Sequence, residues 1–175
     1  MSFSAFRFCP QCASPLHHRD HGGLLRQACA DEACGYVHWD NPVPVVAAVV
    51  EHEGGIILAH SKLWLMRFFG LITGFLEKSD PSPEQAVQRE VMEELGLRAT
   101  AANFIGHYPF PRQNQIIIAY HVPAEGEIIL GDELDEWRRV AFEQAKYWPA
   151  GTGFALRDWL RTQGHDPQPL EWSTT

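Results

Sequence analysis

The sequence has few of the features that would place a protein in a membrane or on nucleic acid. No stretch of its 175 residues approaches the roughly 18 apolar residues that a membrane-spanning helix needs. The longest apolar run, Val43–Val50, is interrupted by Pro44 and has the length of a buried strand. Lys and Arg number 14 against 22 Asp and Glu, which gives a net charge of −8. Because an acidic chain has no broad field that attracts phosphates or anionic lipid, we expect neither a membrane nor a nucleic-acid partner.

The N-terminus also lacks the pattern of an export signal. No long apolar region precedes a small-residue cleavage site, so the sequence predicts a cytoplasmic protein without a signal peptide. The composition, with 45% hydrophobic and 21% charged residues, is typical of a globular protein. The length fits one domain, or a compact domain with a small module beside it. Disorder, collagen and coiled coil are excluded by this composition.

Cysteine is confined to the first 34 residues, where it forms two close pairs. Cys9 and Cys12 are separated by two residues. Cys29 and Cys34 are separated by four, and sixteen residues lie between the pairs. A disulfide framework would require a secreted protein, whereas four thiolates in two pairs fit a tetrahedral zinc ion. The sequence therefore predicts a structural Zn²⁺ held by all four cysteines, with reduced free thiols as the alternative.

This first segment resembles a zinc ribbon, and the composition changes after it. The segment has only three basic residues besides histidine, so we interpret it as a structural module or an interface. Asp40-Asn41-Pro42 has the composition of a linker or turn. We therefore expect a zinc ribbon over residues 1–40, a second domain over 41–164 and a C-terminal tail over 165–175.

Hydrophobic patterning in the second domain predicts both strands and helices. The expected strands are 43–51, 56–60, 71–77, 102–108, 115–122 and 138–142. The expected helices are 83–95 and 152–161. Ser82 is a candidate N-cap followed by Pro83, and Gly96 suits the C-terminal end of the first helix. This order predicts an α+β domain with a mixed or mostly antiparallel sheet.

Three glutamates share one face of the helix expected at 83–95. At about 100° per residue, Glu93 and Glu94 lie within roughly 60° of Glu90. The stripe that we expect to be buried consists of Val87, Val91, Met92 and Leu95. The carboxylates repel one another, the last turn disfavours negative charge, and Arg89 is the only cation in the helix. A hard divalent cation with oxygen ligands would relieve this repulsion, and a solvated acidic face is the alternative.

The segment from Gly74 to Leu97 resembles the Nudix box, Gly-x5-Glu-x7-Arg-Glu-U-x-Glu-Glu-x-Gly-U, where U is a bulky apolar residue. The second half matches at every fixed position, from Arg89 onwards. In the first half Asp80 replaces the glutamate, and the spacer to Arg89 is one residue longer. Both changes fall in the loop before Ser82, so the register of the helix is kept. On this motif the chain is identified as a member of the Nudix family.

A four-cysteine ribbon directly before a Nudix domain is the arrangement of the NADH pyrophosphatase group. The resemblance implies a Nudix fold, an α+β domain with a mixed β-sheet sandwiched between helices, preceded by a small zinc ribbon. It also implies a pyrophosphatase, a hydrolase that cleaves a nucleoside diphosphate derivative to AMP and a second phosphate monoester. Residues 105–113 keep the Pro-Phe-Pro core of the downstream signature of NADH-type enzymes but lack its ends. NADH, FAD and ADP-ribose therefore all stay open as substrates.

The same resemblance implies roles for individual residues. The implied ligands of a catalytic Mg²⁺ or Mn²⁺ are Glu90, Glu93, Glu94, Glu133 and the backbone carbonyl of Thr73. Arg89 would hold a carboxylate through charge-assisted hydrogen bonds, and Glu133 would be a further ligand or the catalytic base. The substrate-binding candidates are Phe69, Glu77, Tyr108 and Phe110. Each aromatic candidate could equally belong to the core.

Two other functions stay open at this level. A nucleotide-binding sensor or regulator would result if the altered loop before the helix weakens catalysis. A Nudix protein directed at RNA caps would use the ribbon to dock RNA, which the net negative charge and sparse lysines disfavour. Relatives in the group are often dimers, so the resemblance makes a homodimer an option for this chain.

Overall fold

The structure is a computed structural model that describes residues 6–171. Residues 1–5 of the expected ribbon and 172–175 of the expected tail lie outside the described residues. By its internal contacts the chain divides into two compact units, Met1–Asn41 and Pro42–Thr175. In the described part of the chain, no helix has the length and apolar character needed to cross a membrane.

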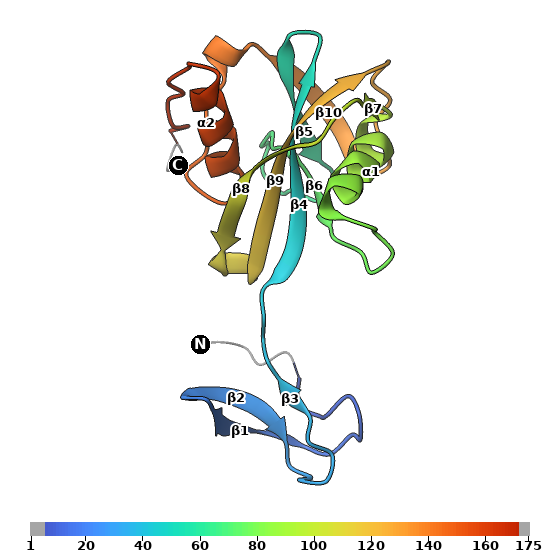
Figure 1. Ribbon diagram of the computed structural model, residues 1–175, viewed down its shortest axis with the longest axis vertical. Coiled ribbons are helices and arrows are strands. Elements are labelled where there is room, and N and C mark those ends of the chain that lie inside the picture. The colour runs from blue at the N-terminus through green and yellow to red at the C-terminus, as the bar shows by residue number, and fades with distance from the viewer. Residues whose placement is uncertain (1–5, 172–175) are drawn as a thin grey trace. The chain divides into compact units, whose positions relative to one another are not determined.

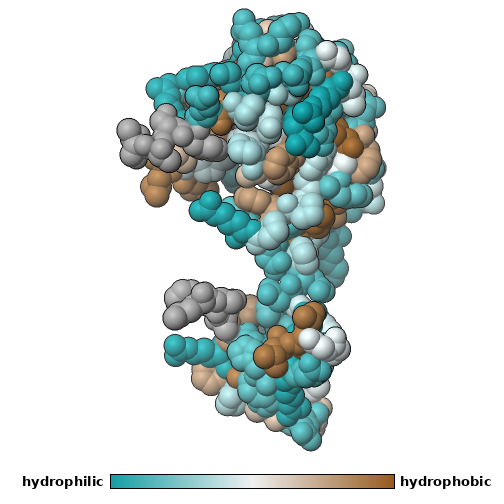
Figure 2. Space-filling view, turned by 90° about the vertical axis from the view of Figure 1, so that its left-hand side faces the viewer, coloured by the Kyte–Doolittle hydropathy of each residue, from teal (hydrophilic) through white to brown (hydrophobic). Residues whose placement is uncertain are grey.

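The N-terminal unit is a small antiparallel sheet with few buried side chains. Its strands are β1 (Leu16–His21), β2 (Leu24–Cys29) and β3 (Val37–His38), in the order β1-β2-β3 (Figure 1). Gly22 and Gly23 form the hairpin turn with φ of 68° and 84°, values that favour glycine. Among its described residues the buried apolar side chains are Cys9, Ala28 and Cys29, and hydrophobic side chains reach its surface (Figure 2). So small a core cannot stabilise the unit without a cross-link or a metal.

The second unit is built on one mixed sheet of seven strands. They are β4 (Val43–His52), β5 (Gly55–Ser61), β6 (Ile72–Phe75), β7 (Arg98–Ala99), β8 (Asn103–Phe110), β9 (Gln115–Glu125) and β10 (Leu134–Val140). The order is β10-β5-β4-β9-β7, with β6 paired to β4 and β8 to β9. Only the β4–β9 pair is parallel among these pairings. The predicted mixed sheet is therefore confirmed.

Two helices cover opposite faces of this sheet. They are α1 (Pro83–Leu95) and α2 (Thr152–Thr162), on either side of the strands (Figure 1). Short 3-10 turns occupy η1 (Pro111–Gln113) and η2 (Phe142–Gln144). The predicted α1 boundaries are confirmed: the Ser82 side chain accepts from the Gln85 N–H at 3.3 Å, and Gly96 is left-handed with φ of 67°. The α+β architecture expected from the sequence, a mixed sheet between helices, is the architecture observed.

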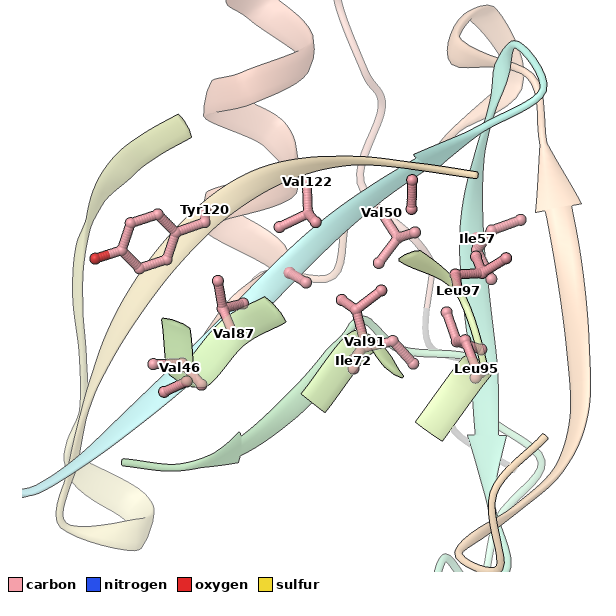
Figure 3. Close-up of a cluster of buried hydrophobic side chains, with 14 of the residues drawn as sticks. Val46, Val50, Ile57, Ile72, Val87, Val91, Leu95, Leu97, Tyr120 and Val122 are labelled. Carbon is pink, nitrogen blue, oxygen red and sulfur yellow. The ribbon is translucent and has the colours of Figure 1, made fainter. Parts of the chain in front are cut away.

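The face of α1 that packs on the sheet differs from the predicted stripe at one residue. Val87, Val91 and Leu95 are buried and lie among core side chains of the strands (Figure 3). Met92 is 47% exposed, so its predicted burial is wrong. Because Met92 lies about 100° from the centre of the stripe, its side chain is directed along the rim of the helix.

The last strand and the segment after α2 also differ from the pattern in the sequence. β10 starts at Leu134 rather than near 138, because Leu134 pairs with Ser61 of β5 before a bulge. After α2, the Leu170 N–H donates to the Tyr147 carbonyl at 2.7 Å, and the Leu170 side chain packs against the α2 core. The described part of the segment expected as a tail is thus joined to the domain.

Candidate functional site

Glu90 of α1 places its carboxylate directly over Gly74 of β6. A Cβ added to Gly74 would lie 1.9 Å from Cδ and from Oε1 of Glu90. The Glu90 residue is only 9% exposed, and burial raises its pKa against the lowering effect of Arg89. The missing side chain of Gly74 therefore makes the space in which this carboxylate is held.

Arg89 joins three carboxylates at the base of the site. Its guanidinium donates to both oxygens of Asp80 at 3.1 and 3.0 Å. It also donates to Oε1 of Glu90 at 2.7 Å and to Oε2 of Glu93 at 2.9 Å. These bonds raise the pKa of Arg89, and the bond to Asp80 has the largest effect. In return, Arg89 lowers the pKa of Asp80. Arg89 thus fixes the orientation of two of the three glutamates on the acidic face.

Asp80 explains how the altered loop keeps this arrangement. Besides the two bonds from Arg89, its Oδ2 accepts from the Glu77 N–H at 2.8 Å. Aspartate is shorter than the glutamate of the motif by one methylene, and the loop before α1 is longer by one residue. The longer loop brings the shorter side chain to Arg89, so the two departures compensate each other.

We expect Asp80→Asn to reduce kcat/KM for diphosphate hydrolysis roughly tenfold, as is typical when a partner that orients ligands is lost. The amide loses the negative charge that pairs with Arg89, so Glu90 and Glu93 are less well positioned. The measurement is steady-state hydrolysis at saturating Mg²⁺, with Ser79→Ala as the control in the same loop. Equal rates for Asp80→Asn and wild type would show that the Asp80–Arg89 pair is not needed.

Glu94 is the carboxylate of α1 without a partner. No hydrogen bond or ion pair of its side chain is found among residues 6–171, whereas Glu90 and Glu93 are both paired with Arg89. Burial, followed by the charges of Glu90, Glu133 and Glu93, raises the pKa of Glu94 to about 8. A desolvated carboxylate among other carboxylates is costly, and a bound cation would remove the cost.

The acidic segment before β10 is fixed against the C-terminal end of α1. The Gly131 N–H donates to the Glu94 carbonyl at 2.9 Å, and the Ile129 N–H donates to the Leu95 carbonyl at 2.9 Å. A Cβ at Gly131 would lie 2.4 Å from the Glu93 carbonyl oxygen, so the two backbones approach closely. Glu133 is thereby placed where its charge acts on Glu94.

The three aromatic candidates lie away from the carboxylates. Tyr108 donates its hydroxyl to Asp158 of α2 at 3.0 Å, and Phe110 packs in the same small cluster under α2. Phe69 packs against the other α2 cluster, with the Arg138 guanidinium 3.8 Å from its ring. The structure does not bring these rings to the acidic face of α1, whose core lies on the opposite face of the sheet.

The other candidates lie close to the acidic face. Glu77 contacts Asp80 through its backbone N–H, and its carboxylate accepts from the Ser79 hydroxyl at 3.3 Å. Thr73 pairs with Ala47 of β4 and directly precedes Gly74.

Two features of the site were not found from the sequence. Phe75 follows Gly74, is 59% exposed and offers its carbonyl to Arg89 at 3.2 Å. Its position directly after Gly74 of the motif could have indicated that Phe75 lies at the site. The buried Tyr120 hydroxyl donates to Glu84 at 3.1 Å, which ties the first turn of α1 to β9. No local pattern in the sequence indicates that contact, because the two residues are 36 positions apart.

The oxygen donors on α1 fit a hydrated divalent ion. In the described chain the only set of three or more His, Cys, Asp or Glu with ligand atoms all within 4.8 Å of one another is the cysteine set, and the α1 carboxylates Glu90 and Glu93 are instead bonded to Arg89. Mg²⁺ commonly binds proteins through one or two carboxylates and keeps several waters, so it does not need a closer cluster. The unpartnered, desolvated Glu94 is the donor that such an ion would satisfy first.

The four cysteines cluster as their spacing predicted. The Sγ atoms of Cys9 and Cys34 are 3.7 Å apart, and those of Cys12 and Cys29 are 3.4 Å apart. A tetrahedral zinc ion with Zn–S bonds of about 2.3 Å requires sulfurs about 3.8 Å apart. The arrangement therefore has the size of a four-sulfur zinc site.

Comparisons with known proteins identify the family of the second unit. A model of the NUDIX domain matches residues 41–162. The chain is 29% identical over 154 residues to the "NAD-capped RNA hydrolase NudC" of Stutzerimonas stutzeri, which covers 87% of the chain and 54% of the relative. It is 30% identical over 116 residues to the protein of that name from Vibrio atlanticus, covering 66% and 41%. The chain thus spans about half the length of the curated relatives it matches.

Solved structures show the same fold. A NUDIX hydrolase from Nitrosomonas europaea superposes with a TM-score of 0.76 at 22% identity, covering 95% of this chain and 97% of the other. An ADP-ribose pyrophosphatase from Streptococcus suis gives a TM-score of 0.56 at 19% identity, covering 75% and 100%. At these identities the likeness establishes the fold and leaves the substrate open.

Proposed function

This chain belongs to the NUDIX family, and from that premise we propose that it is a divalent-metal-dependent hydrolase of a diphosphate that joins two nucleosides, or a nucleoside and a sugar. NADH, FAD and ADP-ribose are the substrates of this type. The observation that carries the proposal is Glu94, a desolvated carboxylate without a partner beside two carboxylates oriented by Arg89. Such a site is costly unless it binds a cation.

Each residue of the site has a separate role in the proposed hydrolysis. When bound, Mg²⁺ or Mn²⁺ supplies charge neutralisation for the diphosphate and activation of water. The groups that would hold it are Glu90, Glu94, Glu93, Glu133 and the Thr73 carbonyl. Arg89 keeps Glu90 and Glu93 oriented. We propose that Glu133 accepts a proton of the attacking water as its oxygen bonds to one phosphorus. The bond from that phosphorus to the bridging oxygen breaks, and the bridging oxygen leaves on the other phosphate, which gives two monophosphates, one of them AMP.

For substrate rings, the structure favours Phe75 over the aromatic candidates of the sequence. Phe75 is exposed and directly beside the residues that surround Glu90, whereas Tyr108 and Phe110 pack under α2. An exposed aromatic ring of this kind can stack on a nucleobase. Glu77 stays in the proposal as a polar contact, because it lies in the same loop as Asp80.

The names of the curated relatives favour a second candidate substrate. Those relatives are called NAD-capped RNA hydrolases, and an NAD cap carries the same kind of diphosphate. The net charge of −8 disfavours extensive contact with the rest of an RNA chain. A homodimer and a cytoplasmic location stay predictions.

A substrate panel tests the proposal. Purified protein is incubated with Mg²⁺ or Mn²⁺ and with NADH, NAD⁺, FAD, ADP-ribose or a short NAD-capped RNA, and mononucleotide release is followed by chromatography. We expect AMP and a second monophosphate from at least one dinucleotide, and far less product with Glu94→Gln. Tight binding without turnover of any compound would instead indicate a sensor. Cleavage of the capped RNA alone would indicate the RNA-directed function.

We also propose that the cysteine cluster holds one structural Zn²⁺ and that this ion stabilises the N-terminal unit. Metal analysis should give about one zinc per chain, lost in Cys9→Ser and kept in Glu32→Gln, a control between Cys29 and Cys34. Hydrogen exchange should show loss of protection over residues 16–38 in Cys9→Ser, because binding free energy is folding free energy in so small a unit. Full protection of the zinc-free unit would contradict this prediction.

A further inference from the structure

Four consecutive apolar side chains are exposed between β5 and β6. This apolar loop consists of Leu63, Trp64, Leu65 and Met66, which are 81%, 38%, 107% and 60% exposed. Single exposed apolar residues are ordinary, but a contiguous set usually marks a surface that binds something. Burying such side chains against a ligand would recover the free energy lost by their contact with water.

The apolar loop is fixed at both ends to the segment that precedes and begins β10. At its start, the Lys62 N–H donates to the Glu133 carbonyl at 3.0 Å, and Nζ of Lys62 donates to the Asp132 carbonyl at 2.6 Å. At its end, Arg67 donates to both carboxylate oxygens of Glu136 at 2.8 Å. The loop is therefore held in position before any ligand arrives, which lowers the entropy cost of binding.

The same segment borders the acidic site. Gly131 contacts the last turn of α1 through the Glu94 carbonyl, and Glu133 acts on the Glu94 carboxylate. Since the Glu133 carbonyl holds the N–H of Lys62, the next residue, Leu63, starts the apolar loop about 4 Å further along the chain. The backbone at the start of the apolar loop thus adjoins the same segment that contacts the last turn of α1.

We propose that the apolar loop is the binding surface for one flat ring system of the substrate, beside the diphosphate held at the acidic face of α1. This inference rests on the proposed function and adds a specificity-determining surface to it. A dinucleotide has a charged centre and flat rings that need apolar contact, as leucine and methionine side chains provide. Because Lys62 and Arg67 are occupied by a carbonyl and by Glu136, the loop does not offer free cations to the phosphates of a nucleic acid.

The test is the double variant Leu63→Ser with Leu65→Ser. Both side chains are exposed, so the melting temperature should stay that of the wild type. We expect KM for the dinucleotide that the protein cleaves to rise roughly tenfold, in line with the loss of buried apolar contact, while kcat changes by less than about twofold. Leu25→Ser, which removes a leucine 75% exposed in the N-terminal unit, is the matched control and should leave KM unchanged.

Direct binding separates this inference from the proposed function. NADH binding, followed by its fluorescence, should weaken in the double variant by the same factor as KM, and this holds even if the wild type cleaves no compound of the panel. Unchanged KM and unchanged NADH binding would overturn the inference. A double variant that sediments as a smaller species than the wild type, with unchanged binding, would also overturn it, because the loop would then contact a second copy of the chain.

Discussion

Replacing Glu94 by glutamine should remove most hydrolysis and at the same time stabilise the protein when no divalent ion is added. The activity should fall by about two to four orders of magnitude, since a metal contributes several kcal/mol to the transition state and each 1.4 kcal/mol is tenfold. The stability should rise because the wild type holds a half-buried carboxylate near three others, and glutamine has the same size without the charge.

The raised pKa of Glu94 determines in which direction the stability of the wild type changes with pH. Glu94 ionises near its ordinary pKa of 4.5 when the chain is unfolded, and near 8 in the folded protein. Below pH 4.5 the side chain is protonated in both states and has no effect on the free energy of unfolding. Between pH 4.5 and 8 the unfolded chain releases a proton that the folded protein keeps, so the wild type loses stability as the pH rises. Glutamine does not titrate, and its advantage should therefore grow across that window.

Thermal denaturation at pH 5 and pH 8 measures this effect, with the zinc site loaded and no Mg²⁺ or Mn²⁺ added. We expect nearly equal melting temperatures at pH 5 and a value several degrees higher for Glu94→Gln at pH 8. Added Mg²⁺ should raise the melting temperature of the wild type and not that of the variant. Glu93→Gln is the matched control: Glu93 is exposed and bonded to Arg89, so its loss should not stabilise the protein. A lower melting temperature for Glu94→Gln at pH 8 would contradict the argument.

The features predicted correctly from the sequence are those fixed by neighbours in the chain. The Ser82 cap spans three residues, and Gly96 closes the last turn with its own backbone, so both ends of α1 follow from local residue types. The two short cysteine spacings indicated which four residues cluster, although the closest Sγ contacts join one pair to the other, Cys9 to Cys34 and Cys12 to Cys29. Local chemistry of this kind is visible in a sequence before any packing is known.

The features that were missed depend on contacts between distant segments. Which face of the sheet Tyr108 and Phe110 occupy is set by the register of β8 on β9 and by a bulge between Phe104 and Gly106. One extra residue reverses the facing of every side chain that follows it. In the sequence Asp80 is only a departure from the motif, because its two hydrogen bonds from Arg89 depend on the path of the loop. Strand register and loop path depend on contacts between distant segments, so no local pattern in one sequence indicates them.

Gly74→Ala should cost nearly as much activity as the loss of Glu90 itself, while the fold is kept. The new Cβ would lie 1.9 Å from Cδ of Glu90, and Cβ atoms do not approach other heavy atoms within 3.0 Å. The atoms in the way are the flexible end of a side chain, so the carboxylate can move aside without displacing the strand. We therefore expect hydrolysis to fall at least about a hundredfold with little change in melting temperature, because a ligand is moved and no core contact is lost.

A double-mutant cycle shows whether the effect of Gly74→Ala acts through Glu90. In a Glu90→Gln background the alanine should reduce activity no further, since the carboxylate it displaces is already absent, whereas independent effects would add. Thr73→Ala is the matched control, because Thr73 lies on the same strand, its side chain faces the other way and its carbonyl is kept. Additive losses in the cycle would mean that Gly74 has a role of its own, such as close approach of the substrate to β6.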